Sequence, residues 1–272
     1  MGTRERRLRS NESDRLISEL FLASGADSDE VAIAAVGSFG RGELSPGSDL
    51  DIVILHTGSY STTALTEIVN SILYPLWDKK VKVDHSVRTR SEVKIALTDD
   101  LKVAMGLLDI RLICGSADLV ADVQTLALDA WRDGADKYLP LLEETLDERY
   151  ERNGELAYLL EPDLKESRGG LRDITALRAM NASGAVNLPM ERISQAESVL
   201  STVREALHLV SGRDKDKLLF TEQDKVAELL KYSDADVLMS DVAQSARAVD
   251  YLAQMAWHQY HQYVITPQGN KY

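Results

Sequence analysis

Two carboxylates stand at the start of an apolar run, in the segment SDLDIVIL. Asp49 and Asp51 are separated by a single residue, and alternate residues of a strand project from the same face. Two carboxylates held this close repel each other unless a cation lies between them. Oxygen ligands of this kind suit a hard divalent ion, and Mg²⁺ is favoured where substrate phosphates complete its coordination. The pair therefore predicts a magnesium site for a substrate that carries phosphates.

A glycine-rich turn, GSFGRG at residues 37–42, precedes the two carboxylates. Small residues in such a turn expose backbone N–H groups that can surround phosphate oxygens. Gly37 and Ser38 are expected to meet a triphosphate, and Arg41 is expected either to bind phosphates or to pair with Glu43. The spacing differs from G-x-G-x-x-G and from the P-loop, so the turn does not predict either of those nucleotide sites.

These groups need a sheet to hold them, and the first third of the chain carries the strand signals. Short apolar runs predict strands at 31–36 and 50–56, and the alternating segment 81–88 predicts a third. Helical spacing predicts helices at 13–24 and 61–77. From about residue 91 the spacing is helical, including residues 99–113. The sequence thus predicts a small α/β domain at 1–92 and an α-helical domain at 93–272.

A turn-rich break, EPDLKESRGGLRD at residues 161–173, interrupts the helical region. Its two glycines permit close approach of the backbone, and a helix that begins after them would offer N–H groups to an anion. Lys165, Gly170, Arg172 and Asp173 are therefore predicted to contact the nucleotide or the acceptor. The alternative is an interdomain hinge that an Arg172–Asp173 pair stabilises.

The segment G-S-F-G-R-G-E-L-S-P-G-S-D-L-D-I, residues 37–52, resembles the active-site signature of the DNA polymerase β-type nucleotidyltransferases. The resemblance implies an α+β fold with a small mixed sheet, followed here by the α-helical domain. It also implies a third carboxylate on a later strand, for which Asp84 is the candidate. By this resemblance Asp49, Asp51 and Asp84 are catalytic and hold two Mg²⁺ ions, which act on the leaving phosphates and on the nucleophile. The alternative for Asp84 is a solvent-facing strand residue.

Four further segments resemble the PII uridylyltransferase/uridylyl-removing family, and they occur in the order of that family. They are Leu76–Thr89, 100–115, 160–174 and 217–223. The resemblance implies transfer of UMP or AMP from UTP or ATP to a tyrosine of a PII nitrogen-signalling protein, with release of pyrophosphate. Full-length members continue into an HD phosphohydrolase domain and two ACT domains. We expect neither here, so deuridylylation and glutamine sensing are not implied.

Two other functions stay open. Glutamine synthetase adenylyltransferases share the G-S-x-x-R-G-E…D-x-D core and a G-G-[LI]-R-D block, although the block HSVRT at residues 85–89 favours the PII branch. The other possibility is a non-catalytic nucleotide-binding module, which the loss of a metal carboxylate would favour. All three candidate carboxylates are present, so the enzyme is the stronger hypothesis.

Composition limits the kinds of partner that we expect for the protein and the cell compartment in which we expect it. The 31 Lys and Arg residues against 44 Asp and Glu residues give a net charge of −13, which is unsuited to general nucleic-acid binding. No apolar run reaches the roughly 18 residues that a membrane-spanning helix needs. The single cysteine, Cys114, excludes an internal disulfide. We therefore expect a cytoplasmic protein with no membrane or nucleic-acid partner. Trp77 and His85 are expected to pack in the core.

Overall fold

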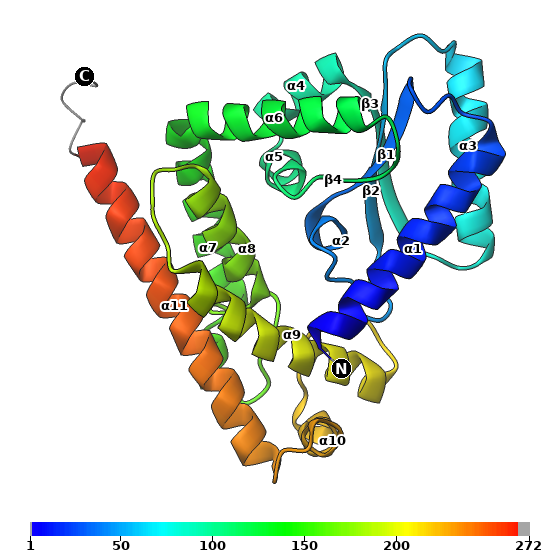
Figure 1. Cartoon of the computed structure of the whole chain (residues 1–272). Coiled ribbons are helices and arrows are strands. Elements are labelled where there is room, and N and C mark those ends of the chain that lie inside the picture. The colour runs from blue at the N-terminus through cyan, green and yellow to red at the C-terminus, as the bar shows by residue number, and fades with distance from the viewer. Residues whose placement is uncertain (1, 266–272) are drawn as a thin grey trace. The chain divides into compact units, whose positions relative to one another are not determined.

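The computed structural model describes residues 2–265, which form the two compact units of the chain (Figure 1). The chain divides after Ala130: Thr3–Ala130 is one unit, and the other begins at Trp131 and also takes in Gly2. The first unit combines a sheet with helices and the second is helical, so the predicted α+β class is confirmed. The expected domain boundary after residue 92 lies inside the first unit.

A four-stranded mixed sheet forms the centre of the first unit. In spatial order its strands are β3 (Val83–Thr89), β2 (Leu50–His56), β1 (Val31–Ala35) and β4 (Arg111–Gly115). β1 is antiparallel to both of its neighbours, whereas β2 and β3 are parallel. Within the described sheet, β3 and β4 are therefore the edge strands.

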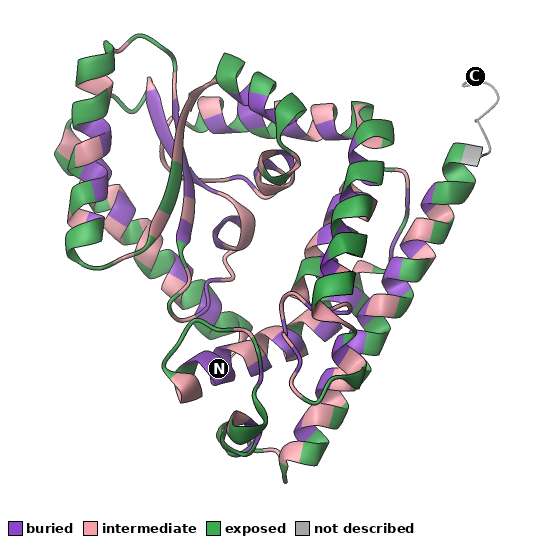
Figure 2. Cartoon of the chain, turned by 180° about the vertical axis from the view of Figure 1, so that it is seen from behind, coloured by how far each residue is buried: buried purple, intermediate pink, exposed green. Residues whose placement is uncertain are grey.

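Alternation along the strands sorts their side chains between the two faces of the sheet. Ile54 of β2 joins a core with Ile17 of α1 (Thr3–Ser24) and Ile72 of α3 (Thr62–Asp78). The helices α4 (Arg90–Asp99), α5 (Leu101–Leu107) and α6 (Ala117–Asp133) lie on the opposite face (Figure 1). Figure 2 shows β1 and β2 largely buried and the edge strand β3 more exposed.

The strand β4 corrects the expectation that residues 99–113 are helical throughout. The helix α5 ends at Leu107, and Arg111–Gly115 pair with β1 instead. β1 is buried along its whole length, so the backbone groups on its second edge need partners within the protein. The local spacing of apolar residues fits a helix here. The need for a strand arises from the second edge of β1, which lies far away in the sequence.

Lys80 ends the helix α3 in a left-handed conformation, with φ of 60°. Its N–H donates to the carbonyl of Trp77 at 2.8 Å, and the N–H of Val81 donates to the carbonyl of Leu76 at 3.0 Å. These two bonds form a Schellman motif, in which glycine is the usual residue at this position. The turn leads directly into β3.

The second unit consists of packed helices, as the sequence predicts. They are α7 (Ala135–Asn153), the 3₁₀ turn η1 (Leu156–Tyr158), α8 (Leu171–Ala182), α9 (Met190–Ser211), α10 (Phe220–Leu230) and α11 (Ala235–Ile265). The long helix α11 packs against α8, α9 and α10. Trp131 is 1% exposed and stacks on Tyr138 with the ring centroids 4.9 Å apart. None of the helices in the described part of the chain is long and apolar enough to cross a bilayer.

Two residues that were expected in the core lie at the surface instead. Trp77, in the last turn of α3, is 42% exposed, and His85 of β3 is also exposed. Both stand where the edge strand lacks a further neighbour in the described sheet, so no strand covers them. A single apolar pattern could not distinguish this edge from a central strand.

Candidate functional site

Strand pairing places Asp51 and Asp84 side by side. The two residues are Cα partners in the parallel β2–β3 pair, and partners in register project from the same face of a sheet. Asp49 precedes β2 by one residue; its side chain is 56% exposed, and the Nζ of Lys82 lies 3.9 Å from its Oδ1. The three predicted carboxylates thus lie at the same end of two neighbouring strands.

The glycine turn lies on the other side of Asp51, at the end of β1. The N–H of Val36 donates to the carbonyl of Asp51 at 3.0 Å, which ties the turn to β2. Gly37 has a φ of 56°, in the left-handed region that glycine adopts without cost. A Cβ atom at this position would lie 3.6 Å from Oδ2 of Asp51. Asp51 is therefore flanked by Gly37 from β1 and by Asp84 from β3.

The guanidinium of Arg41 is paired with two carboxylates. Its Nε donates to Glu43 at 2.8 Å and its Nη1 donates to Asp109 at 2.5 Å. Burial lowers the pKa of Arg41, but the charges of Asp109 and Glu43 outweigh burial and raise it. The structure thus contains the Arg41–Glu43 pair that was one of the two sequence-based alternatives. A contact between Arg41 and phosphates stays a prediction.

Arg111 of β4 fastens the glycine turn to its surroundings. Its Nε donates to the carbonyl of Gly40 at 3.0 Å, and its Nη2 donates to the carbonyl of Phe39 at 3.2 Å. The same guanidinium binds both carboxylate oxygens of Asp14 on α1, at 2.8 and 3.1 Å. A Cβ atom on Gly40 would lie only 2.0 Å from the carbonyl oxygen of Asp109.

Sequence reasoning missed the contributions of Arg111 and Asp109, because both lie in the segment that was expected to be helical. Their roles depend on β4, and nothing in the local pattern indicates that strand. Ser38 is half-buried in the four-residue helix α2 (Gly37–Gly40). It follows Gly37, the glycine that lies beside Asp51. Its expected contact with a triphosphate stays a prediction.

The chemistry of the three carboxylates suits a magnesium ion. Their oxygens are hard ligands of the type that Mg²⁺ prefers. Because residue 37 is glycine, it places no side chain in the space next to Oδ2 of Asp51. Among the side chains that the structure describes, no three from His, Cys, Asp or Glu are drawn together into a metal cluster. Magnesium binding is therefore a proposal that depends on the chemistry of the donors.

The loop at residues 161–173 lies in the second unit, and its glycines are fixed by packing. A Cβ atom on Gly169 would lie 2.6 Å from the carbonyl oxygen of Ala246 on α11. A Cβ atom on Gly170 would lie 2.7 Å from the carbonyl oxygen of Ser167. The two glycines thus allow the loop to fold tightly on itself and against α11.

The side chain of Asp173 is enclosed by the protein, and its expected contact with a nucleotide stays a prediction. Asp173 is 1% exposed; it pairs with Arg149, and it accepts bonds from the hydroxyl of Tyr150 at 3.0 Å and from the N–H of Gly169 at 2.5 Å. Burial raises the pKa of Asp173, although the charge of Arg149 opposes this shift. In the structure the carboxylate holds the loop through these bonds.

The N–H groups at the start of α8, where an anion was expected, donate to carbonyls of the loop. The N–H of Leu171 donates to the carbonyl of Leu164 at 3.0 Å, and the N–H of Arg172 donates to the carbonyl of Lys165 at 3.1 Å. The loop itself therefore takes up these N–H groups. Arg172 pairs with Glu166 at 3.2 Å, so the proposed Arg172–Asp173 hinge pair is not formed.

The comparisons with known proteins agree with the layout of the first unit. The model of the nucleotidyltransferase domain matches residues 19–103, which include all three carboxylates and the glycine turn. The model described as GlnD PII-uridylyltransferase matches residues 141–183 and 186–257. The helical part of the chain is thus similar to PII-uridylyltransferases. The whole loop at residues 161–173 lies within the first of these two matched segments.

Curated relatives extend the match to nearly the whole chain. The bifunctional uridylyltransferase/uridylyl-removing enzyme of Streptomyces coelicolor is 44% identical over 95% of this chain and 31% of its own length. Proteins of the same name from Mycobacterium tuberculosis and Vibrio parahaemolyticus are 36% and 34% identical over 84% and 93% of this chain. The chain spans about a third of the length of these relatives.

Lys165 belongs to a charged cluster centred on Asp216. Its Nζ lies 4.0 Å from Oδ2 of Asp216. The other oxygen, Oδ1, accepts a bond from Nε of Arg204 at 2.6 Å and lies 2.8 Å from Nε2 of His208. Burial opposes ionisation of Asp216, but the bonds with His208 and Arg204 dominate and lower its pKa to about 2. Lys165 is 36% exposed, and its contact with a nucleotide stays a prediction.

Asp216→Asn should make the unfolding of the protein less sensitive to acid. A carboxylate whose pKa is lower in the folded state contributes stability above about pH 4, and this contribution is lost as the pH falls towards about 2. We expect the variant to lose about 1–3 kcal/mol at neutral pH and to show a flatter acid limb, measured by urea unfolding from pH 7 to 2. Asp224→Asn, an exposed residue of α10, is the control. An acid limb equal to that of the wild type would contradict the assignment.

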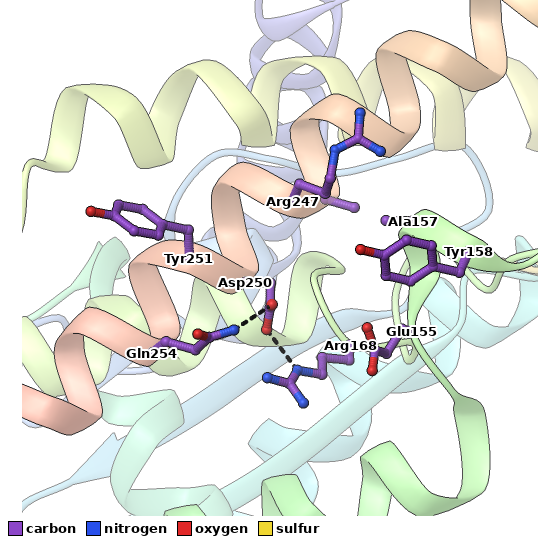
Figure 3. A pocket seen from close by; sticks show the side chains of 9 residues that line it. Glu155, Ala157, Tyr158, Arg168, Arg247, Asp250, Tyr251 and Gln254 are labelled. Atoms are coloured by element: carbon purple, nitrogen blue, oxygen red, sulfur yellow. Dashed lines mark hydrogen bonds and ion pairs between the residues drawn. The ribbon is translucent and has the colours of Figure 1, made fainter.

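A shallow cavity of about 220 Å³ lies in the second unit, between η1 and α11 (Figure 3). The ion pair between Arg168 and Asp250, at 2.6 Å, forms part of its wall, and Gln254 donates to Asp250 at 2.8 Å. Tyr158 and Tyr251 stand at its rim and are 74% and 58% exposed. None of the predicted site residues lines this cavity.

Proposed function

We propose that this chain transfers UMP from UTP to a tyrosine hydroxyl of a PII-type signalling protein, with release of pyrophosphate. What supports the proposal is the flanking of Asp51 by Gly37 and Asp84. This order provides a turn for phosphates, a central carboxylate and a second carboxylate in register with it. The names of the family and of the curated relatives supply the uridylyl group and the PII acceptor.

In this mechanism different residues of the chain bind the nucleotide, hold magnesium and accept the proton. The turn at Gly37 and Ser38 binds the triphosphate through backbone N–H groups and a hydroxyl. Asp49, Asp51 and Asp84 would hold magnesium, which neutralises the developing phosphate charge when it is bound. Asp84 accepts the proton of the tyrosine hydroxyl as the tyrosine oxygen forms a bond to the α-phosphorus. The bond from the α-phosphorus to the bridging oxygen breaks, and the electron pair leaves with pyrophosphate.

The experiment is intact-mass spectrometry of a PII-type protein after incubation with this chain, Mg²⁺ and either UTP or ATP. We expect a gain of one UMP per modified tyrosine, and no gain in the presence of a chelator. A gain of AMP would keep the transferase and change its base. No gain with either nucleotide, while nucleotide binding persists, would replace the proposal with a sensor module or with a different acceptor.

A further inference from the structure

Three aromatic rings form an exposed cluster at the junction of α3 and β3. Tyr74 and Trp77 on α3 are 56% and 42% exposed, and their ring centroids lie 5.6 Å apart. His85 on β3 continues the cluster, with its ring 6.2 Å from that of Trp77. Both contacts are edge-to-face, so the rings hold one another in place while their outer surfaces stay in contact with solvent.

The inner side of α3 already supplies the core of the unit. Ile72 and Leu76 are fully buried there, so Tyr74 and Trp77 are not needed to fill it. Exposed aromatic groups that lie together are enriched at surfaces that bind other proteins. The aromatic cluster therefore has the composition of a binding surface.

Lysines adjoin the aromatic cluster in a chain whose net charge is −13. Lys79, Lys80 and Lys82 are all exposed, and Asp78 is the acidic residue in the same turn. The left-handed conformation of Lys80 fixes the direction in which the chain turns here. A ligand for this surface would combine an apolar side chain with carboxylate groups.

The order of the strands determines from which side an acceptor approaches. In-line displacement requires the nucleophile and the leaving group to lie on opposite sides of the phosphorus. If the triphosphate binds the turn after β1, the acceptor hydroxyl arrives from the side of β3, because Asp51 lies between Gly37 and Asp84. β3 is an edge strand of the described sheet, so an extended segment can lie along it.

We propose that Tyr74, Trp77, His85, Lys79 and Lys80 form the docking surface for the acceptor protein. The occupant is an extended segment of the acceptor that carries the reactive hydroxyl, an apolar side chain for the rings and carboxylates for the lysines. Asp84 is the neighbour of His85 on β3 and projects from the other face. Side chains of a segment paired with this edge alternate between the faces in the same way, so one can meet the rings while the next meets Asp84. This inference rests on the proposed transfer to a protein hydroxyl.

The test separates acceptor binding from nucleotide binding. With a PII-type protein and UTP, the double variant Tyr74→Ser/Trp77→Ser should raise the KM for the protein about tenfold. The KM for UTP, and kcat at saturating acceptor, should stay within about twofold of the wild type. Tyr74→Ser alone, which removes the more exposed ring, covers the case in which the double variant unfolds. The matched control is Leu22→Ser on α1, whose side chain is 78% exposed outside the cluster.

Charge is tested with Lys79→Gln/Lys80→Gly, since glycine suits the left-handed position. This variant should raise the KM for the acceptor and flatten its dependence on salt. Direct binding of the fluorescently labelled PII-type protein, without nucleotide, separates the two proposals. Wild-type transfer with unchanged KM values in the variants would overturn the docking surface and leave the proposed function intact. Acceptor binding that the variants weaken, in a wild type that shows no transfer, would support the docking surface and overturn the proposed reaction.

Discussion

Asp51→Asn is expected to lower the rate of nucleotidyl transfer by about 100-fold or more, which corresponds to roughly 2.7 kcal/mol of transition-state stabilisation. Asp51 lies between the glycine turn and Asp84. Its carboxylate would therefore be the central ligand of a magnesium ion held at this site. The amide removes a negative charge beside two other carboxylates and relieves their repulsion. The free energy of unfolding should therefore stay within about 1 kcal/mol of the wild-type value. Rapid-quench kinetics and urea unfolding measure the two quantities.

Glu67→Gln is the matched control for this prediction. Glu67 is an exposed carboxylate of α3 in the same unit, and the exchange removes the same charge away from the site. Its rate should equal that of the wild type. A rate for Asp51→Asn close to that of Glu67→Gln would remove Asp51 from the catalytic machinery.

Gly40→Ala is expected to damage both the stability of the first unit and its affinity for nucleotide. The new Cβ would lie 2.0 Å from the carbonyl oxygen of Asp109, and a backbone atom cannot rotate away. The turn must shift, which also breaks the bond from Arg111 to the Gly40 carbonyl. We expect a loss of about 2–4 kcal/mol in urea unfolding, together with weaker UTP binding by calorimetry.

Gly106→Ala gives the comparison for the same exchange at an open position. Gly106 lies in α5, and no atom is found within 4 Å of its added Cβ. Because alanine favours the helix, this variant should gain about 0.5–1 kcal/mol. If Gly40→Ala were as stable as Gly106→Ala, the close approach of Asp109 to the turn would be wrong.

The sequence predicted β1 and β2 because each is a short apolar run, and β3 because its residues alternate. Asp49 and Asp51 were visible as a pair. The expectation that Asp84 lies beside Asp51 came from a family resemblance. The sequence of residues 81–88 does not indicate which residue of β2 pairs with Asp84. Register depends on the packing of whole faces, and a shift of one residue would turn Asp84 to the other side.

The loop at residues 161–173 shows where residue types alone allow two interpretations. Its glycines and charged residues suggested an anion site, but the same types also build a tight, self-contained loop. The N–H groups at the start of α8 are taken up by carbonyls of Leu164 and Lys165, and Asp173 is enclosed by Arg149 and Tyr150. The sequence alone does not show which residues these hydrogen bonds bring together.

The central position of β1 sets a sequence of events during protein synthesis. β2 leaves the ribosome soon after β1, but β4 follows only after α3, β3, α4 and α5. Until Arg111–Gly115 have emerged, one hydrogen-bonding edge of a wholly buried strand has no partner in its sheet. A nascent chain that stalls before this point, or a fragment cut at residue 92, presents that edge to other chains and is prone to aggregate.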